Sequence, residues 1–124
     1  MTNRNVEAGR LVNGTGGGGV SADIDNPTGK SAHIVIDITS ITGTTPTATF
    51  TVQGKDPVSG KYYTLLASAA LNANGTTVLK IGPGLTAAAN LVANDVVPRT
   101  LRVSWSTTGT ITDLDATVGV CLID

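Results

Sequence analysis

One histidine and one cysteine limit the chemistry available to this chain. His33 and Cys121 are the sole residues of their types, so any catalytic triad or thiol–imidazole pair must use them. The acidic residue nearest to His33 with the same strand parity is Asp37, about 13 Å away at roughly 3.3 Å per strand residue. A direct hydrogen bond cannot span that distance, so Asp23, Asp95 or another strand would have to supply the partner. This inventory predicts that the protein is not an enzyme.

Two further patterns resemble parts of metal sites. Asp113 and Asp115 would place two carboxylates on one strand face, as in part of a calcium site, but two ligands do not complete such a site. One thiol and one imidazole cannot form a structural zinc site. We therefore expect no metal and no cofactor, and we interpret the two aspartates as solvated.

Glycine-rich segments mimic nucleotide-binding loops. Gly14, Gly16 and Gly19 satisfy the spacing G-x-G-x-x-G, but a dinucleotide site needs a helix after this motif. The residues that follow alternate like a strand, so we interpret the run as a flexible hinge. The sequence Gly29-Lys30-Ser31 resembles the end of a phosphate loop, but the first glycine of that motif would fall at Ile24.

Apolar and polar residues alternate along most of the chain. The strands that this alternation predicts must position the candidate functional residues named above. Residues 32–39 carry apolar side chains at every even position, and the same period recurs in 47–53, 100–105 and 116–122. Strand side chains point to opposite faces in turn, so each segment has one apolar face. Packing these faces together predicts an all-β fold, an antiparallel β-sandwich of seven or eight strands with jelly-roll or Ig-like topology.

Connectors between the alternating segments predict which strands pair. Residues 42–46 are a short connector, which predicts a hairpin between the runs on either side. By the same argument, residues 107–110 predict a final hairpin that joins 100–106 to 112–123.

The middle of the chain contains further turn signals. Pro57 and Gly60 predict a turn before a strand at 62–67, and a second turn leads to a strand at 76–81, as in a β-meander. Residues 85–95 show no clear period, which leaves two interpretations open, a single helical turn or a long surface loop.

Composition indicates a single domain with a nearly neutral surface. The chain has 124 residues, a net charge of −1 and 14% charged residues, against about 25% in an average soluble domain. Threonine, with 20 residues, supplies the missing polarity. The charge balance predicts no attraction to nucleic acid or anionic membranes, and no apolar run reaches the length of a membrane span. The first residues lack a secretory signal, so we expect synthesis and retention in the cytoplasm, or export by another route.

The N-terminal residues differ from the rest of the chain. Ordering residues 1–19 would cost about 1–2 kcal/mol per residue, and their large apolar side chains (Val6, Leu11 and Val12) would return roughly 1.5–3 kcal/mol each. We therefore predict two parts, a flexible, Gly-rich, extended arm at 1–19 and a β-sandwich domain at 20–124. The arm is expected to be mobile in the free protein or held against a neighbour after assembly.

The few aromatic residues indicate how the surface is used. Trp105 is in phase with Leu101 and Val103, so we expect it in the core. Tyr62 and Tyr63 are adjacent and must point to opposite faces, so one of them is a candidate exposed anchor for a partner.

Two stretches carry a resemblance to a known group of proteins. Residues 44–56 (TTPTATFTVQGKD) and 62–66 (YYTLL) are followed by a terminal segment at 99–105 (RTLRVSW). This combination resembles small β-sandwich virion proteins of tailed bacteriophages, of the head decoration or minor capsid type, over residues 20–123. The resemblance implies a virion component on the outer surface of an icosahedral shell, and it implies no catalytic residues.

The resulting functional expectation is a capsid decoration or cementing protein, synthesised in the host bacterial cytoplasm, that stabilises the phage head. Its expected partners are the major capsid protein and further copies of itself, as a homotrimer or homodimer, with no nucleic acid and no membrane. A tail or fibre module that binds host carbohydrate is the alternative. The predicted contact residues are Arg4, Arg10, Leu11, Val12, Tyr62, Leu91, Val92 and Val96.

Overall fold

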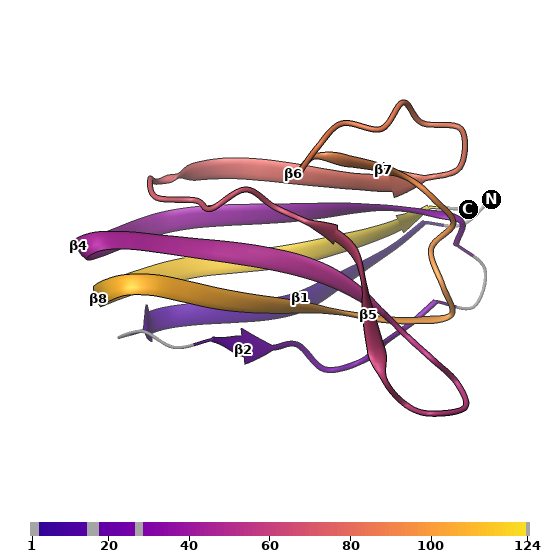
Figure 1. The fold of residues 1–124 in the computed structure, drawn as a ribbon, viewed down its shortest axis with the longest axis horizontal. Helices are drawn as coiled ribbons and strands as arrows, with labels where there is room; N and C mark the ends of the chain where they lie inside the picture. Colours follow the sequence, from indigo (N-terminus) through magenta and orange to yellow (C-terminus); the bar gives the residue numbers. More distant parts are fainter. Residues whose placement is uncertain (1–2, 15–17, 27–28, 124) are drawn as a thin grey trace.

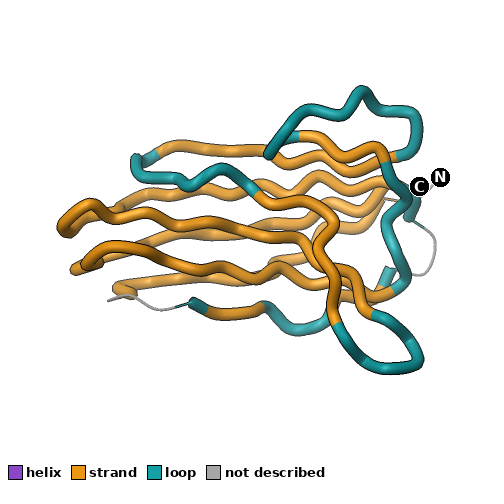
Figure 2. Tube along the Cα trace, viewed as in Figure 1, coloured by secondary structure: helices purple, strands orange, loops and turns teal. Residues whose placement is uncertain are grey.

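The fold consists of strands and the segments that connect them (Figure 2). A computed structural model describes residues 3–14, 18–26 and 29–123, the first of these ranges by its backbone. No helix occurs among these residues, so none of them belongs to a helix that could cross a membrane. The predicted all-β class is confirmed. Residues 15–17 of the predicted hinge and residues 27–28 of a predicted turn lie outside the described residues.

Within the described residues, eight strands form one hydrogen-bonded sheet. Their bounds are β1 Asn3–Gly14, β2 Gly19–Val20, β3 Ile24–Asp25, β4 Ser31–Lys55, β5 Tyr62–Ala67, β6 Gly75–Gly82, β7 Val92–Asn94 and β8 Thr100–Ile123. The main order is β1-β8-β4-β6-β7, while β2 and β3 also pair with β8, and β5 pairs with β4. All these pairs are antiparallel except β6 with β7, which is parallel.

The two long strands β4 and β8 form the central ribbon of the fold. They pair along almost their whole length, from Ser31 opposite Ile123 to Gly54 opposite Leu101. Figure 1 shows both strands reversing direction at the same end of the molecule, so the ribbon folds back on itself. The first half of β4 also pairs with β6 and the second half with β5. The apolar faces therefore meet within a single curled sheet.

Both hairpins predicted within this ribbon are wrong. Residues 42–46 and 107–110 are corners inside β4 and β8, and the two halves of each strand pair with the other strand. The corner contains Gly43, Thr45 and Gly109, with φ angles of +144°, +45° and +74°. A hairpin turn joins two strands that pair with each other, whereas here two paired strands bend back together at one corner. Both use the same types of turn residue, so the connector sequences alone could not distinguish a hairpin from this corner.

The predicted turn at 56–61 is confirmed, and it joins β4 and β5 in a hairpin in which Lys55 lies opposite Tyr62. Within the turn, Asp56 accepts a hydrogen bond from the Val58 N–H at 3.0 Å, and Gly60 has a φ of +75°. The predicted meander from β5 to β6 is wrong, since each of these strands pairs with a different half of β4.

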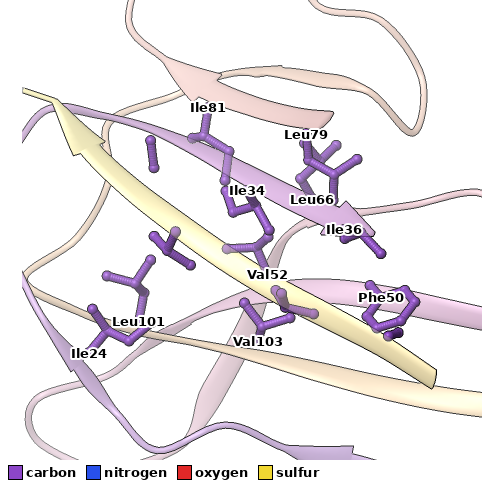
Figure 3. Close-up of a cluster of buried hydrophobic side chains, with 14 of the residues drawn as sticks. Ile24, Ile34, Ile36, Phe50, Val52, Leu66, Leu79, Ile81, Leu101 and Val103 are labelled. Atoms are coloured by element: carbon purple, nitrogen blue, oxygen red, sulfur yellow. The ribbon is translucent and has the colours of Figure 1, made fainter. Parts of the chain in front are cut away.

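Alternation predicted the core correctly. The even-numbered residues Ile34, Ile36, Phe50 and Val52 of β4 are fully buried, although they come from opposite sides of the corner. They belong to one apolar cluster, which Figure 3 shows gathered between the strands. The other labelled members are Ile24, Leu66, Leu79, Ile81, Leu101 and Val103. One continuous core thus holds both halves of the ribbon together.

A buried amide ties the start of the domain to the segment before β8. Asn26 is 4% exposed, and its Oδ1 accepts a hydrogen bond from the Gly29 N–H at 2.8 Å. Its Nδ2 donates to the carbonyl oxygens of Gly29 at 2.8 Å and Pro98 at 3.2 Å. Every polar atom of this side chain therefore has a partner, as burial requires.

Residues 3–14 of the expected arm form β1, which pairs with β8 from Asn3 opposite Ile123 to Gly14 opposite Leu114. The division of the chain into an arm at 1–19 and a domain at 20–124 stays a prediction. The described part of the arm lies at the edge of the sheet.

Candidate interaction surfaces

His33 and Cys121 are direct cross-strand partners, which the sequence did not predict. His33 of β4 lies opposite Cys121 of β8 on one side and opposite Lys80 of β6 on the other. Both neighbours of His33 in the chain, Ala32 and Ile34, are fully buried, so His33 occupies the outer face of the sheet. The pairing depends on the register of strands almost 90 residues apart, for which the sequence carries no local signal.

Two acidic side chains on this outer face accept hydrogen bonds from hydroxyl groups. Asp113 accepts a hydrogen bond from the Ser40 hydroxyl at 2.8 Å, and Asp37 accepts one from Thr76 at 3.4 Å. Within residues 18–26 and 29–123, no three His, Cys, Asp or Glu side chains gather in a way that could hold a metal ion. These carboxylates therefore belong to a polar sheet surface.

The second half of the ribbon carries a connected group of polar side chains on its outer face, here called the Tyr62 cluster (Asp23, Gln53, Lys55, Tyr62 and Arg102). The Tyr62 hydroxyl donates to Asp23 at 2.6 Å, and the Lys55 ammonium donates to the same carboxylate at 3.0 Å. The Arg102 guanidinium lies 3.4 Å from the centre of the Tyr62 ring, and its Nε donates to Gln53 at 2.8 Å. Four chain segments are thus fastened together across the sheet.

Hydrogen bonding within this cluster stabilises its charged forms. The Tyr62 hydroxyl, and after it the Lys55 ammonium, lowers the pKa of Asp23 below its usual 3.8. The hydrogen bond to Asp23 raises the pKa of Lys55 above its usual 10.5. Asp23, Lys55 and Arg102 together carry one excess positive charge at neutral pH.

The two adjacent tyrosines have different environments. Tyr62, the predicted contact residue, is half-buried and engaged in the Tyr62 cluster. Tyr63 is 47% exposed, and its ring lies against Gly54, where an added Cβ would come within 2.6 Å of the ring. The exposed aromatic side chain on this strand is therefore Tyr63. The alternation of side chains along the strand could not show which of the two tyrosines is exposed.

The connection from β6 to β8 presents apolar side chains to solvent. Leu85, Leu91 and Val96 are 38%, 48% and 54% exposed, and Val92 is half-buried. The Lys80 N–H donates to the Leu91 carbonyl oxygen at 2.9 Å, which holds this connection against β6. Three predicted contact residues, at 91, 92 and 96, therefore lie within one surface segment, which we call the 85–97 loop. It contains β7 and no helical turn.

The other predicted contact residues lie on β1. In the register of β1 with β8, Arg4 lies opposite Leu122, Arg10 opposite Thr117 and Leu11 opposite Ala116. Val12 follows at a point where this register shifts. The predicted contact residues therefore fall into two separate groups, the edge strand β1 and the 85–97 loop, with Tyr62 apart from both.

Trp105 lies at the border of the core. It is partly buried, packs against the apolar cluster and has its ring centre 6.4 Å from that of Phe50. Gly19 of β2 lies opposite Trp105, and a Cβ added to Gly19 would come within 2.8 Å of the indole ring. Glycine at this position allows the chain to cross close to the ring.

The fold resembles chains in solved structures of a virus. No protein-family model and no curated protein matches this chain. A chain in the structure of infectious bursal disease virus, Gx strain, matches over 97% of this protein with 11% identity and a TM-score of 0.54. The corresponding match in the Gt strain covers 98% with 12% identity and a TM-score of 0.44.

This likeness concerns the fold. Our chain covers 31% of the length of the Gx-strain chain, so it corresponds to about a third of that protein. The match supports the expected virus-type β-fold, and it comes from a virus other than a tailed bacteriophage. The phage origin inferred from short sequence motifs stays a prediction.

Proposed function

We propose that this protein is a structural component of a virion, a decoration or cementing subunit on the outer surface of a capsid. In this role it binds the lattice of the major capsid protein and stabilises the shell. The observation that carries the proposal is the fold likeness to a chain of infectious bursal disease virus, which extends over 97% of our chain. The resemblance of residues 20–123 to phage decoration proteins supports a tailed phage as the source of this shell.

The outer faces of the sheet suit a protein that works by contact. Along β4 and β8 the outward positions carry small hydroxyl side chains at Thr39, Thr49, Thr51, Ser104 and Thr117. Short polar side chains on the surface of a sheet permit close approach of another protein and lose little rotamer entropy when covered. A partner surface can therefore approach closely at these hydroxyl positions.

The 85–97 loop supplies the adhesive contacts in this proposal. The 85–97 loop offers exposed Leu91 and Val96, whose burial by a capsid subunit would remove apolar surface from water. The contact made by one subunit is small, but a shell carries many copies of the subunit and therefore many such contacts. Binding to the assembled lattice then stabilises it by mass action.

Shell stability provides the test. Shells assembled with the protein should melt at a higher temperature than shells that lack it, and restoring the purified protein should restore the higher value. A Leu91→Ser/Val96→Ser variant should bind shells more weakly, whereas Val58→Ser, a change at a 94% exposed residue outside this loop, should bind normally. Equal melting temperatures with and without bound protein would contradict a cementing role.

The alternative function, a tail or fibre module for host carbohydrate, depends on an exposed aromatic ring. Tyr63 is such a ring, so Tyr63→Ala is the decisive variant. Loss of cell or glycan binding in this variant would favour the alternative. Full shell binding by the same variant is expected for a decoration protein.

A further inference from the structure

Among the described residues, strand β1 is paired along one edge only. It is 12 residues long and lies at the end of the sheet, and among residues 3–14, 18–26 and 29–123 it pairs with β8 alone. An edge strand of this length presents a row of backbone N–H and C=O groups that favour pairing with another strand. The mean strand in proteins is only about 5–6 residues long.

From this edge we propose that two copies of the protein form a two-fold dimer by antiparallel pairing of β1 with β1 of the second copy. The pairing joins the two curled sheets into one continuous sheet across the dimer. Isologous two-fold contacts are the commonest type in soluble oligomers. The inference concerns the free protein in solution and does not depend on where in a virion the protein resides.

Charge complementarity defines one register for this pairing. Over residues 5–12 the numbers of opposite residues add up to 17, so that Asn5 of one copy faces Val12 of the other. In this register Glu7 faces Arg10 of the second copy, and Arg10 faces Glu7. The two charge pairs are related by the dimer axis.

A bulge in β1 makes this register compatible with the sheet. Opposite residues in an antiparallel pair must share a face, and in a regular strand positions 7 and 10 would lie on different faces. In β1, however, Glu7 lies opposite Gly119 and Arg10 opposite Thr117, with the register shift between Glu7 and Gly9. Because positions 117 and 119 share a face of β8, positions 7 and 10 share a face of β1.

The same bulge aligns the apolar positions. Val6 lies opposite Val120 and Leu11 opposite Ala116, two positions of the inner face of β8, both of them buried. In the register that pairs Glu7 with Arg10, Val6 of one copy faces Leu11 of the other. A register in which Glu7 faces its own copy would instead place like charges opposite each other, since the two Glu7 carboxylates would then be cross-strand partners.

Charge reversal tests the pairing in the full-length protein. The dissociation constant of the dimer, measured by sedimentation equilibrium, should rise about tenfold or more in Glu7→Arg and in Arg10→Glu, because each change places like charges opposite each other twice per dimer. The double variant Glu7→Arg/Arg10→Glu should restore the dimer. Lys61→Glu, a matched charge reversal in the exposed turn at 56–61, should leave the constant unchanged.

Disulfide trapping tests the register independently. In a Cys121→Ser background, chains with Asn5→Cys and chains with Val12→Cys should form a mixed disulfide with each other, and neither should form one with itself. Opposite residues in antiparallel strands lie within the distance that a disulfide can bridge.

The outcomes separate this inference from the proposed function. A monomeric wild-type protein at its highest soluble concentration overturns the dimer, as do single charge reversals without effect or self-disulfides at position 5 or 12. A monomer whose β1 variants lose shell binding assigns this edge to the capsid protein instead. Whether the intact dimer binds shells tests only the proposed function and leaves the dimer itself unaffected.

Discussion

Gly109 of β8 lies against the carbonyl oxygen of Thr45 in β4, at the corner where the paired ribbon reverses. A Cβ added to Gly109 would overlap this oxygen and also approach the Thr44 carbonyl within 2.7 Å. The residue also has a left-handed φ of +74°. The position therefore demands glycine twice, for backbone conformation and for space.

Gly109→Ala is expected to destabilise the protein by about 2–4 kcal/mol, from left-handed strain and the displaced backbone together. Gly60→Ala is the matched control, because Gly60 has nearly the same φ, +75°, with no atom within 4 Å of the added Cβ. That variant should cost only about 1 kcal/mol. Equal losses in urea unfolding would mean that the corner is not tightly packed.

The assignment of alternate β4 side chains to the core can be tested by substituting two adjacent residues. Ile34→Ala should lower the free energy of unfolding by about 2–5 kcal/mol, because Ile34 is fully buried in the core. Val35→Ala, one residue along and 36% exposed, should change it by only about 0.5 kcal/mol. A reversed order of the two effects would contradict the observed register.

The hydroxyl of Tyr62 is expected to control the acidity of Asp23. Removing it in Tyr62→Phe should raise the pKa of Asp23 towards 3.8, as measured by NMR titration of the carboxyl carbon. Tyr63→Phe, at the adjacent exposed ring, should leave this pKa unchanged. No difference between the two variants would rule out the hydrogen bond as the main cause.

The lowered pKa of Asp23 has a defined consequence for acid stability. A carboxyl whose pKa is lower in the folded state stabilises the fold above its unfolded pKa, near 3.8, and this contribution disappears as the pH falls through the folded value. The pKa of Asp56, lowered first by the Val58 N–H, has the same sign. Tyr62→Phe should therefore lose less stability than wild type on acidification below about pH 4.

Asn26 is expected to be the most sensitive polar residue. Asn26→Asp would remove two N–H donors and place a carboxylate against the carbonyl oxygens of Gly29 and Pro98, so we expect a loss of about 3 kcal/mol or more. Asn74→Asp, at an exposed turn, should be nearly neutral. Similar thermal midpoints for both variants would contradict the buried network.

The sequence predicted the faces of the strands better than their partners. Ile34, Val52 and Val103 were assigned to the core by parity, and all three are fully buried. Parity is a local property, set by the two-residue period of a strand. Pairing between β4 and β8 depends on contacts across almost the whole chain, which no short segment encodes.

The corners and the surface clusters were missed for the same reason. The connectors at 42–46 and 107–110 contain turn residues, and these residues serve a ribbon corner as well as a hairpin. The Tyr62 cluster joins Asp23, Lys55 and Arg102 from distant segments. Its one visible signal was the shared parity of Gln53 and Lys55, which could not reveal the partners across the sheet.

The most direct test of the proposed function is to locate the protein in purified virus particles by electron cryo-microscopy. The decoration role predicts many copies of this curled sheet on the outer surface of the shell, each in contact with major capsid protein subunits. Particles that carry the protein solely at the tail, or that contain none of it after purification, would contradict that role.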